Sequence, residues 1–340
     1  MLVDSFLFFQ ELDLLEIRLK YLYPYIDKFI IIESCQTFNG SKKDYIFEKN
    51  INKFSRYLEK IFYYKITDFH QDPESLITYL EKNKNKNKKF IANLLKSHNY
   101  YNKSIIWQIL DSYQRECIHL ALKKICKPSD LVIFSDVDEI PSIKVIKKLI
   151  NKDLNLPLVC KQYEFKYFLN CLNRSDWNGS IISKYSYLKN RSLNLMRHNS
   201  NNLNSLEKGG YHFTSMGNEK TIKNKIENWT HQEFNTPEIK NNILKNIQFG
   251  RDIFYRFGVK KNKIINLSKK NIIDKRLTKI ILNYEELIIK KIEKENIFEF
   301  LNYKFTQIKL NLKRIIKNPF LILNKISFLI KNHFDNPKGL

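Results

Sequence analysis

Short apolar segments alternate with helical segments through the first 150 residues, and this alternation constrains the fold more than any other feature. The run 131–134 is wholly apolar, which is typical of a strand in a parallel sheet covered on both faces. Residues 2–9, 28–34 and 61–67 also have strand character, and leucines at helical spacing over 11–23 separate the first two. Strands that alternate with helices favour an open α/β sheet flanked by helices.

The remaining segments are less regular. We expect a Lys/Asn-rich loop over 81–89 and one long helix over 104–125, where apolar residues recur at helical spacing. Residues 158–169 have the pattern of an aromatic strand. The stretch 173–210 is rich in Asn, Ser and Gly and is expected to be mostly loop, and a helix is expected over 221–234.

Positive charge dominates the chain, with 59 Lys and Arg against 35 Asp and Glu and a formal net charge of +24. This balance favours an acidic partner, although the general richness in Lys, Asn and Ile weakens the inference. Residues 300–340 carry eight Lys or Arg against Asp335, with apolar residues between them. Such a helix either lies on an anionic membrane or packs on the main domain with a Lys-rich outer face. We therefore expect a main domain over 1–260 and a basic, mostly helical extension over 261–340.

Five cysteines occur without Cys-x-x-Cys spacing, at positions 35, 117, 126, 160 and 171. They predict neither a disulfide framework nor a zinc site, and they favour a reducing, cytoplasmic compartment. Asp4 interrupts the first apolar stretch, so a secretory signal is not expected. No apolar run approaches the length of about 18 residues that a membrane span requires.

Three carboxylates follow the apolar run 131–134 directly, in the segment Ser135-Asp136-Val137-Asp138-Glu139-Ile140-Pro141. Ligands of open α/β sheets bind beyond the carboxyl ends of strands, and acids packed there repel one another unless a cation neutralises them. Asp136 and Asp138 are therefore candidate ligands of Mg²⁺ or Mn²⁺ bound together with substrate phosphates. The alternative is a solvated acidic turn that caps the next helix.

Further candidates lie outside this segment. Glu233 continues the apolar stripe of the 221–234 helix, where it is either a general base or a helix-end carboxylate paired with a lysine. His212 follows two glycines and either completes a metal shell, contacts a phosphate or is structural. Arg115, next to Gln114, is a candidate phosphate ligand at the edge of a helical stripe, with an ordinary surface arginine as the alternative.

Several short blocks occur in a recognisable order: 8–19, 28–33, 37–43, 107 with 114–115, 135–141, 210–213, 223–227, 231–237 and 250–254. Together they resemble glycosyltransferase family 17 over roughly residues 1–260. That family includes the β-1,4-mannosyl-glycoprotein β-1,4-N-acetylglucosaminyltransferases. The resemblance implies a GT-A-like nucleotide-sugar fold and an inverting transfer of a sugar, with N-acetylglucosamine from UDP-GlcNAc as the first choice, to a glycan acceptor.

The same resemblance implies roles for individual residues. Mn²⁺ or Mg²⁺ would be held by Asp138 and Asp136, with His212 completing the shell, and would bridge the donor diphosphate. Glu233 is the expected catalytic base, and Asp176 is the second candidate. The residues expected to line the nucleotide pocket or to meet the phosphates are Glu11, Glu33, Gln114, Arg115 and Asp136.

Two other classes of protein remain as alternatives. A basic nucleic-acid-binding protein would leave the acidic segment unexplained, because its carboxylates would repel a phosphate backbone. A metal-dependent phosphohydrolase would act on phosphate esters without a sugar acceptor, but aspartyl phosphatases usually carry their Asp-x-Asp on the first strand. The expected partners are a UDP-sugar and a glycan acceptor that is lipid-linked, a polysaccharide or a glycoprotein, with peripheral membrane contact through 300–340 and no nucleic acid. The expected location is the cytoplasm or the inner face of a membrane.

Overall fold

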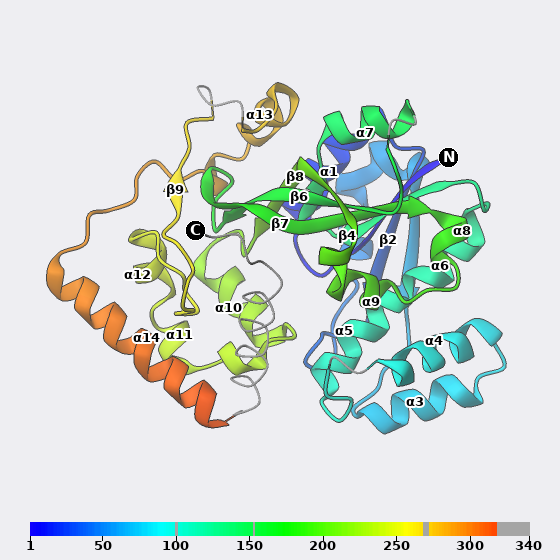
Figure 1. Cartoon of the computed structure of the whole chain (residues 1–340), viewed down its shortest axis with the longest axis horizontal. Coiled ribbons are helices and arrows are strands. Elements are labelled where there is room, and N and C mark those ends of the chain that lie inside the picture. The colour runs from blue at the N-terminus through cyan, green and yellow to red at the C-terminus, as the bar shows by residue number, and fades with distance from the viewer. Residues whose placement is uncertain (99–100, 152–153, 268–271, 318–340) are drawn as a thin grey trace, which may run out of the picture. The chain divides into compact units, whose positions relative to one another are not determined.

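The computed structural model describes residues 1–98, 101–151, 154–267 and 272–317. They divide into two compact units (Figure 1). Unit 1 comprises Met1–Gln232 and Lys263–Lys290, and unit 2 comprises Glu233–Asn262 and the described residues from Lys291 onward. The chain thus leaves unit 1 and returns to it, and the expected boundary at residue 260 lies within unit 2.

Unit 1 is built on one mixed sheet with the strand order β3-β2-β1-β4-β7-β6-β8-β5, and β9 pairs with β7. The first four strands are parallel to one another, whereas β7 is antiparallel to both β4 and β6. Their bounds are β1 Leu2–Leu7, β2 Lys28–Ser34, β3 Ile61–Ile66, β4 Leu131–Asp136, β5 Glu139–Pro141, β6 Leu158–Lys166, β7 Cys171–Lys184, β8 Asn204–Thr214 and β9 Lys263–Ile264.

Helices cover both faces of this sheet (Figure 1). On one face lie α1 (Leu12–Leu22), α2 (Ile46–Lys49), the 3₁₀ helix Ile51–Lys60, α7 (Ile143–Ile150) and α13 (Lys275–Ile281). On the other lie α3 (Pro73–Lys82), α4 (Lys86–Ser97), α5 (Ile106–Glu116), α6 (Ile118–Ile125), α8 (Tyr185–Leu188) and α9 (Leu193–His198). Alternate residues of β1 point to opposite faces of the sheet, and each face packs against its own helices in a hydrophobic core. Phe6 packs with α1, and Val3 and Leu7 pack with α5 and α6. The predicted open α/β sheet flanked by helices is confirmed.

The sheet curls strongly on the β8 side. Only two residues separate the end of β4 from the start of β5, yet β5 pairs with β8 at the far end of the strand order. The link from Asp136 to Glu139 can span at most about 11 Å. Strands β7, β6 and β8 must therefore curl until the β8 edge returns to the end of β4.

Unit 2 is smaller and mainly helical in its described part. It contains α11 (Pro237–Lys240), α12 (Ile243–Gln248) and α14 (Ile297–Lys317). No helix in the described ranges is both long enough and apolar enough to cross a lipid bilayer. Residues 318–340, the second part of the basic tail expected over 300–340, lie outside the described residues.

Several elements differ from the sequence-based expectations. The stretch 173–210 is not loop, because β7 occupies most of its first half, pairs on both sides and buries Ile181 and Ile182. The expected loop 81–89 is only a short connection, since α4 begins at Lys86 and buries Ile91, Ala92 and Leu95 beneath its lysines. In both segments tertiary packing overrides a polar composition.

The expected helices also have different limits. The helix over 104–125 is interrupted at Cys117, which separates α5 from α6. The helix over 221–234 is α10, Glu219–Asn228, and it ends because Trp229 is extended. Pro141 closes β5, and the Ser142 side chain caps α7, the helix that follows.

Candidate functional site

The segment from Asp136 to Glu139, here called the acidic turn, lies at the carboxyl ends of β1 and β4. Leu7 and Asp136 are register partners, and the Val137 N–H donates to the Leu7 carbonyl at 3.1 Å. Helix α1 follows β1 closely and is preceded by Glu11. The prediction that the acidic segment follows a buried strand at this edge of the sheet is confirmed, and this edge is where open α/β sheets bind ligands.

Arg18 holds the acidic turn from the side of α1. Its guanidinium is fully buried and pairs with the fully buried Asp4 through Nε at 2.8 Å and Nη2 at 2.6 Å. Nη2 also donates to Ser135 Oγ at 2.8 Å. Nη1 donates to three carbonyl oxygens of the turn, those of Asp136 at 2.9 Å, Val137 at 3.2 Å and Glu139 at 2.9 Å. One side chain thus fixes the backbone of the turn, because its planar fork presents five donors.

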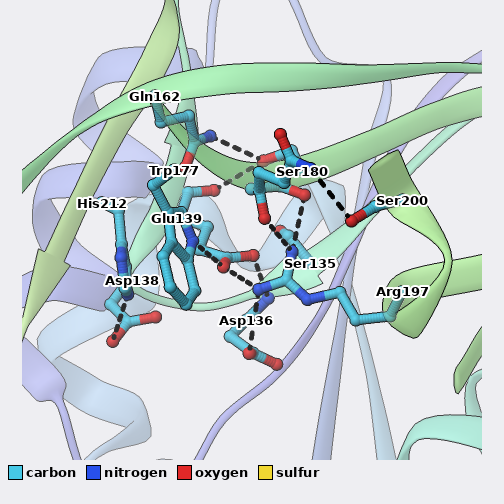
Figure 2. A network of polar contacts seen from close by, with 12 residues as sticks. Ser135, Asp136, Asp138, Glu139, Gln162, Trp177, Ser180, Arg197, Ser200 and His212 are labelled. Atoms are coloured by element: carbon cyan, nitrogen blue, oxygen red, sulfur yellow. Dashed lines mark hydrogen bonds and ion pairs between the residues drawn. The ribbon is translucent and has the colours of Figure 1, made fainter. Parts of the chain in front are cut away.

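The carboxylate of Glu139 is turned inward and satisfied by protein donors (Figure 2). Trp177 Nε1 donates to its Oε1 at 2.7 Å, and Arg197 pairs with the same oxygen. The Asp136 N–H donates to Oε2 at 3.3 Å. Since this side chain is fully buried, its contacts make Glu139 a residue that positions its neighbours.

Asp136 faces two arginines. Arg115 Nη1 donates to its Oδ1 at 2.7 Å, and Arg197 Nη2 lies 3.8 Å from Oδ2. Burial raises the pKa of Asp136, but the two guanidinium groups outweigh that effect and hold the pKa below its usual value. Arg115 also contacts Asp111 at 3.4 Å, so the predicted phosphate ligand is already paired with carboxylates.

Asp138 lies between a lysine and a histidine. Lys225 Nζ, from α10, is 3.4 Å from Asp138 Oδ2 and 3.3 Å from Glu11 Oε1, so two carboxylates converge on one ammonium group. His212 Nε2 lies 3.7 Å from the same Asp138 oxygen. Burial opposes ionisation of Asp138, yet Lys225 and His212 hold its pKa well below the usual range.

His212 lies in strand β8, which also contains the two glycines that precede it. Its ring stacks on Trp177 with centroids 4.5 Å apart, and its Nδ1 is 3.6 Å from Glu164 Oε1. Burial lowers the pKa of His212, but Asp138 and Glu164 together raise it to about 9. The imidazole is therefore cationic at neutral pH, flanked by carboxylates on both sides.

Helix α10 brings Lys225 to this edge of the sheet. Asn218 caps its first turn by accepting from the Thr221 N–H at 3.0 Å. Asn39 Nδ2 donates to the Glu227 carbonyl at 2.6 Å, and Asn224 contacts the Gln10 side chain. These contacts tie α10 to the segments that follow β1 and β2.

The other predicted site residues have different surroundings. Glu33 is fully buried and accepts from the backbone N–H of Ile46 and Phe47, so it caps α2. Gln114 Nε2 donates to the Gln36 carbonyl at 3.0 Å. Asp176 is exposed on β7, where Arg174 Nε lies 3.9 Å from its carboxylate. The structure therefore gives Glu33 and Gln114 identifiable packing roles.

Glu233 is not on the stripe that singled it out. Helix α10 ends at Asn228, and Glu233 is an exposed residue in the 3₁₀ turn Gln232–Phe234, where unit 2 begins. The periodicity argument for a carboxylate on an apolar helix face is thus wrong. Its role as a base, which came from the family resemblance, stays a prediction.

Five residues of the site were missed from the sequence: Arg18, Glu164, Trp177, Arg197 and Lys225. Arg18 carried a usable signal, because it is a charged residue on the apolar face of α1, between Leu15 and Leu22, and a buried charge requires a partner. The others carried no local signal. Lys225 lies 87 positions from Asp138, and Arg197 lies 58 positions from Glu139.

A divalent cation would need several oxygen or nitrogen ligands arranged around one point. Within the described ranges no group of three or more His, Cys, Asp or Glu side chains is arranged to hold a metal ion. Glu11 and Asp138 do converge on one cationic point, which is the ammonium of Lys225, and carboxylate oxygens suit Mg²⁺ and Mn²⁺. The donor set therefore fits such an ion in kind, and the metal site stays a prediction.

The fold and the site define an α/β protein with a cluster of charged side chains at the carboxyl ends of its parallel strands. Residues 1–109 match the model of Glycosyltransferase family 17. The match covers about a third of the chain, from β1 into α5, so the chain is similar to that family over this segment. It includes Glu11, Arg18 and Glu33 but ends before the acidic turn. No curated protein sequence matches the chain.

Proposed function

We propose that the protein transfers a sugar, with inversion, from a nucleotide-sugar donor to a glycan acceptor, and that UDP-N-acetylglucosamine is the donor. The observation that supports this most directly is the cluster of cations around the acidic turn. Arg115, Arg197, His212 and Lys225 all lie within 4 Å of its carboxylates, at the edge of the sheet where β1 and β4 end. The similarity of residues 1–109 to glycosyltransferase family 17 also supports the proposal, because that segment includes β1 and Glu11 at the same edge.

These cations suit a diphosphate. Guanidinium and ammonium groups bind phosphate oxygens through charge-assisted hydrogen bonds. When the glycosidic bond to the donor breaks, negative charge grows on the departing diphosphate, and cations held in advance stabilise that charge. Lys225 is the best placed of them, because it bridges Glu11 and Asp138 loosely, at 3.3 and 3.4 Å, and can rotate toward a phosphate.

The proposal includes Mn²⁺ or Mg²⁺ held by Asp138, with His212 and Asp136 as further ligands. When bound, such an ion would supply Lewis-acid stabilisation of the leaving UDP. His212 can act as a ligand only after it loses its proton, and Lys225 must move aside. Inversion also requires a base for the acceptor hydroxyl, and Glu233 and Asp176 remain the proposed candidates in that order.

The test is a comparison of two lysines on the same helix. Lys225→Met removes the ammonium beside Asp138, whereas Lys223→Met removes a lysine that pairs with Glu219 on the outer side of α10. We expect Lys225→Met to weaken UDP-N-acetylglucosamine binding by at least about tenfold, about 1.4 kcal/mol, and Lys223→Met to leave it unchanged. Titration calorimetry with and without Mn²⁺ measures both, and Lys225→Arg should retain part of the affinity.

Two results would contradict the proposal at different levels. If folded wild-type protein binds no sugar nucleotide with Mn²⁺ present, the assignment of the site as a donor site is wrong. If donor binding is the same in EDTA and in Mn²⁺, and Asp138→Asn does not change this, the metal is wrong while sugar transfer stands.

A further inference from the structure

Helix α14 exposes a continuous apolar stripe. Seven of its apolar side chains are more than half exposed, with exposed fractions from 51% to 78%: Ile297, Phe298, Leu301, Phe305, Ile308, Leu312 and Ile316. At 3.6 residues per turn they fall within an arc of about 100°, and they extend over about 28 Å of helix. Isolated exposed apolar residues are ordinary, but a patch of this extent indicates an interaction surface.

The opposite side of α14 is polar and faces unit 2. Its side chains donate to backbone carbonyls of the segment 252–256: Tyr303 to Asp252 at 3.1 Å, Gln307 to Arg256 at 2.9 Å, Asn311 to Tyr255 at 2.7 Å and Arg314 to Phe254 at 2.9 Å. Leu310 is the buried apolar residue of this side. An amphipathic helix on a globular unit normally buries its apolar face. In α14 that arrangement is reversed, and folding of unit 2 does not account for the stripe.

Lysines border the stripe on both sides. Lys304 follows one border, and Lys309 and Lys313 follow the other. All three are exposed. Glu299 is the one acid of α14, and its carboxylate pairs with Lys245 at 2.8 Å. Glu238, on α11, lies 3.7 Å from Lys313 Nζ and offsets part of the charge on that border. The surface is therefore apolar in the middle, and lysines outnumber acids along its borders.

We propose that α14 binds an anionic lipid surface, lying in the plane of the interface with its apolar stripe among the acyl chains. A helix in this position buries its apolar face about 5–10 Å deep, and lysines near anionic headgroups strengthen the binding. The stripe and its borders match both requirements. This inference is independent of the proposed sugar transfer.

A second copy of this chain fits the surface less well. Two α14 helices packed along their stripes would bring the bordering lysines of one copy against those of the other, and α14 offers no unpaired acid to neutralise them. Anionic headgroups complement both borders at once. The charge pattern therefore favours a membrane over self-association.

Binding of the full chain to vesicles tests the proposal. We expect sedimentation with vesicles of phosphatidylcholine and phosphatidylglycerol to be at least tenfold stronger than with phosphatidylcholine alone. The variant Phe298→Ser, Phe305→Ser, Ile316→Ser should lose at least tenfold in binding, because it removes three apolar side chains of the stripe. These side chains are exposed and contribute little to folding, so the variant should remain folded. The matched control is Phe69→Ser, Ile150→Ser, Leu282→Ser, which alters three exposed apolar residues of unit 1 and should bind like the wild type.

A charge variant separates the two contributions. Lys309→Gln, Lys313→Gln should reduce the preference for anionic vesicles several-fold, whereas Lys144→Gln, Lys147→Gln on the outer side of α7 should have a smaller effect. Failure of the wild type to bind anionic vesicles would overturn the proposal. So would full binding by the triple serine variant, which would assign the contact to another part of the chain. A wild-type dimer that the triple variant converts to a monomer, without vesicle binding, would assign the stripe to a second copy.

Discussion

Replacement of Arg18 by methionine tests whether one buried guanidinium supports the acidic turn. The substitution keeps most of the side-chain length and removes every donor. It leaves the Asp4 side chain fully buried without its cationic partner, which costs about 3–5 kcal/mol. It also removes the donor shared by three carbonyl oxygens of the turn, and unsatisfied buried acceptors cost about 1–3 kcal/mol more. A domain is stable by only about 5–15 kcal/mol, so Arg18→Met should be close to unfolded.

Two companion variants divide this cost. Arg18→Lys keeps a charge for Asp4 but cannot reach Ser135 and the turn carbonyls together, so we expect a loss of about 1–3 kcal/mol. The double variant Asp4→Leu, Arg18→Met removes the unpaired charge and should recover at least about 2 kcal/mol relative to Arg18→Met. Arg56→Met is the control, because Arg56 is 61% exposed and its ion pair with Glu16 should contribute less than about 1 kcal/mol.

Urea unfolding followed by circular dichroism gives the free energy of unfolding of each variant. The reasoning is refuted if Arg18→Met lies within about 1 kcal/mol of the wild type. It is also refuted if the double variant is as unstable as Arg18→Met, since the buried Asp4 charge would then not be the main cost.

Three further outcomes are expected. Gly209→Ala should destabilise the protein by about 1–3 kcal/mol, because the added Cβ would lie 2.7 Å from Cys160 Cβ and 2.8 Å from its Cα; an unchanged thermal midpoint would contradict this. Glu33→Gln should cost about 3–5 kcal/mol in urea unfolding, because it leaves the Lys43 ammonium buried without its carboxylate; a loss below about 1 kcal/mol would contradict this. Burial lowers the pKa of His98 below its ordinary value of 6.5, so the unfolded chain binds a proton that the folded protein excludes, and stability should fall as the pH falls below 6.5; His98→Gln should flatten that decline in unfolding experiments on either side of this pH.

The parallel half of the sheet was predictable because its signals are local. Strand β2 has the predicted bounds, since an apolar β-branched run specifies a strand buried on both faces without help from distant residues. Strand β7 was missed for the opposite reason. Its composition is that of a loop, and it becomes a strand only because β4 and β6 pair with it on either side.

The candidate site likewise has one part that the local sequence predicts and one part that it does not. The acidic turn was found because a strand end and three acids are adjacent in the chain. The groups that control those acids come from far away: Arg18 lies 118 positions from Asp136, and Lys225 lies 87 positions from Asp138. No local pattern in the sequence indicates which distant residues will pair, so the electrostatics of the site could not be predicted from the sequence.

The curl of the sheet has a consequence for how this protein can vary. Strands β4, β7, β6, β8 and β5 are paired in succession, and the short link through Val137 and Asp138 joins β5 back to β4. The five strands thus form a circuit with one covalent closure. An added or deleted residue in that link would shift β5 against β8, and a shift of one position turns every side chain to the opposite face. The pairing of the whole circuit therefore constrains the length of the acidic turn, in addition to any constraint on its side chains.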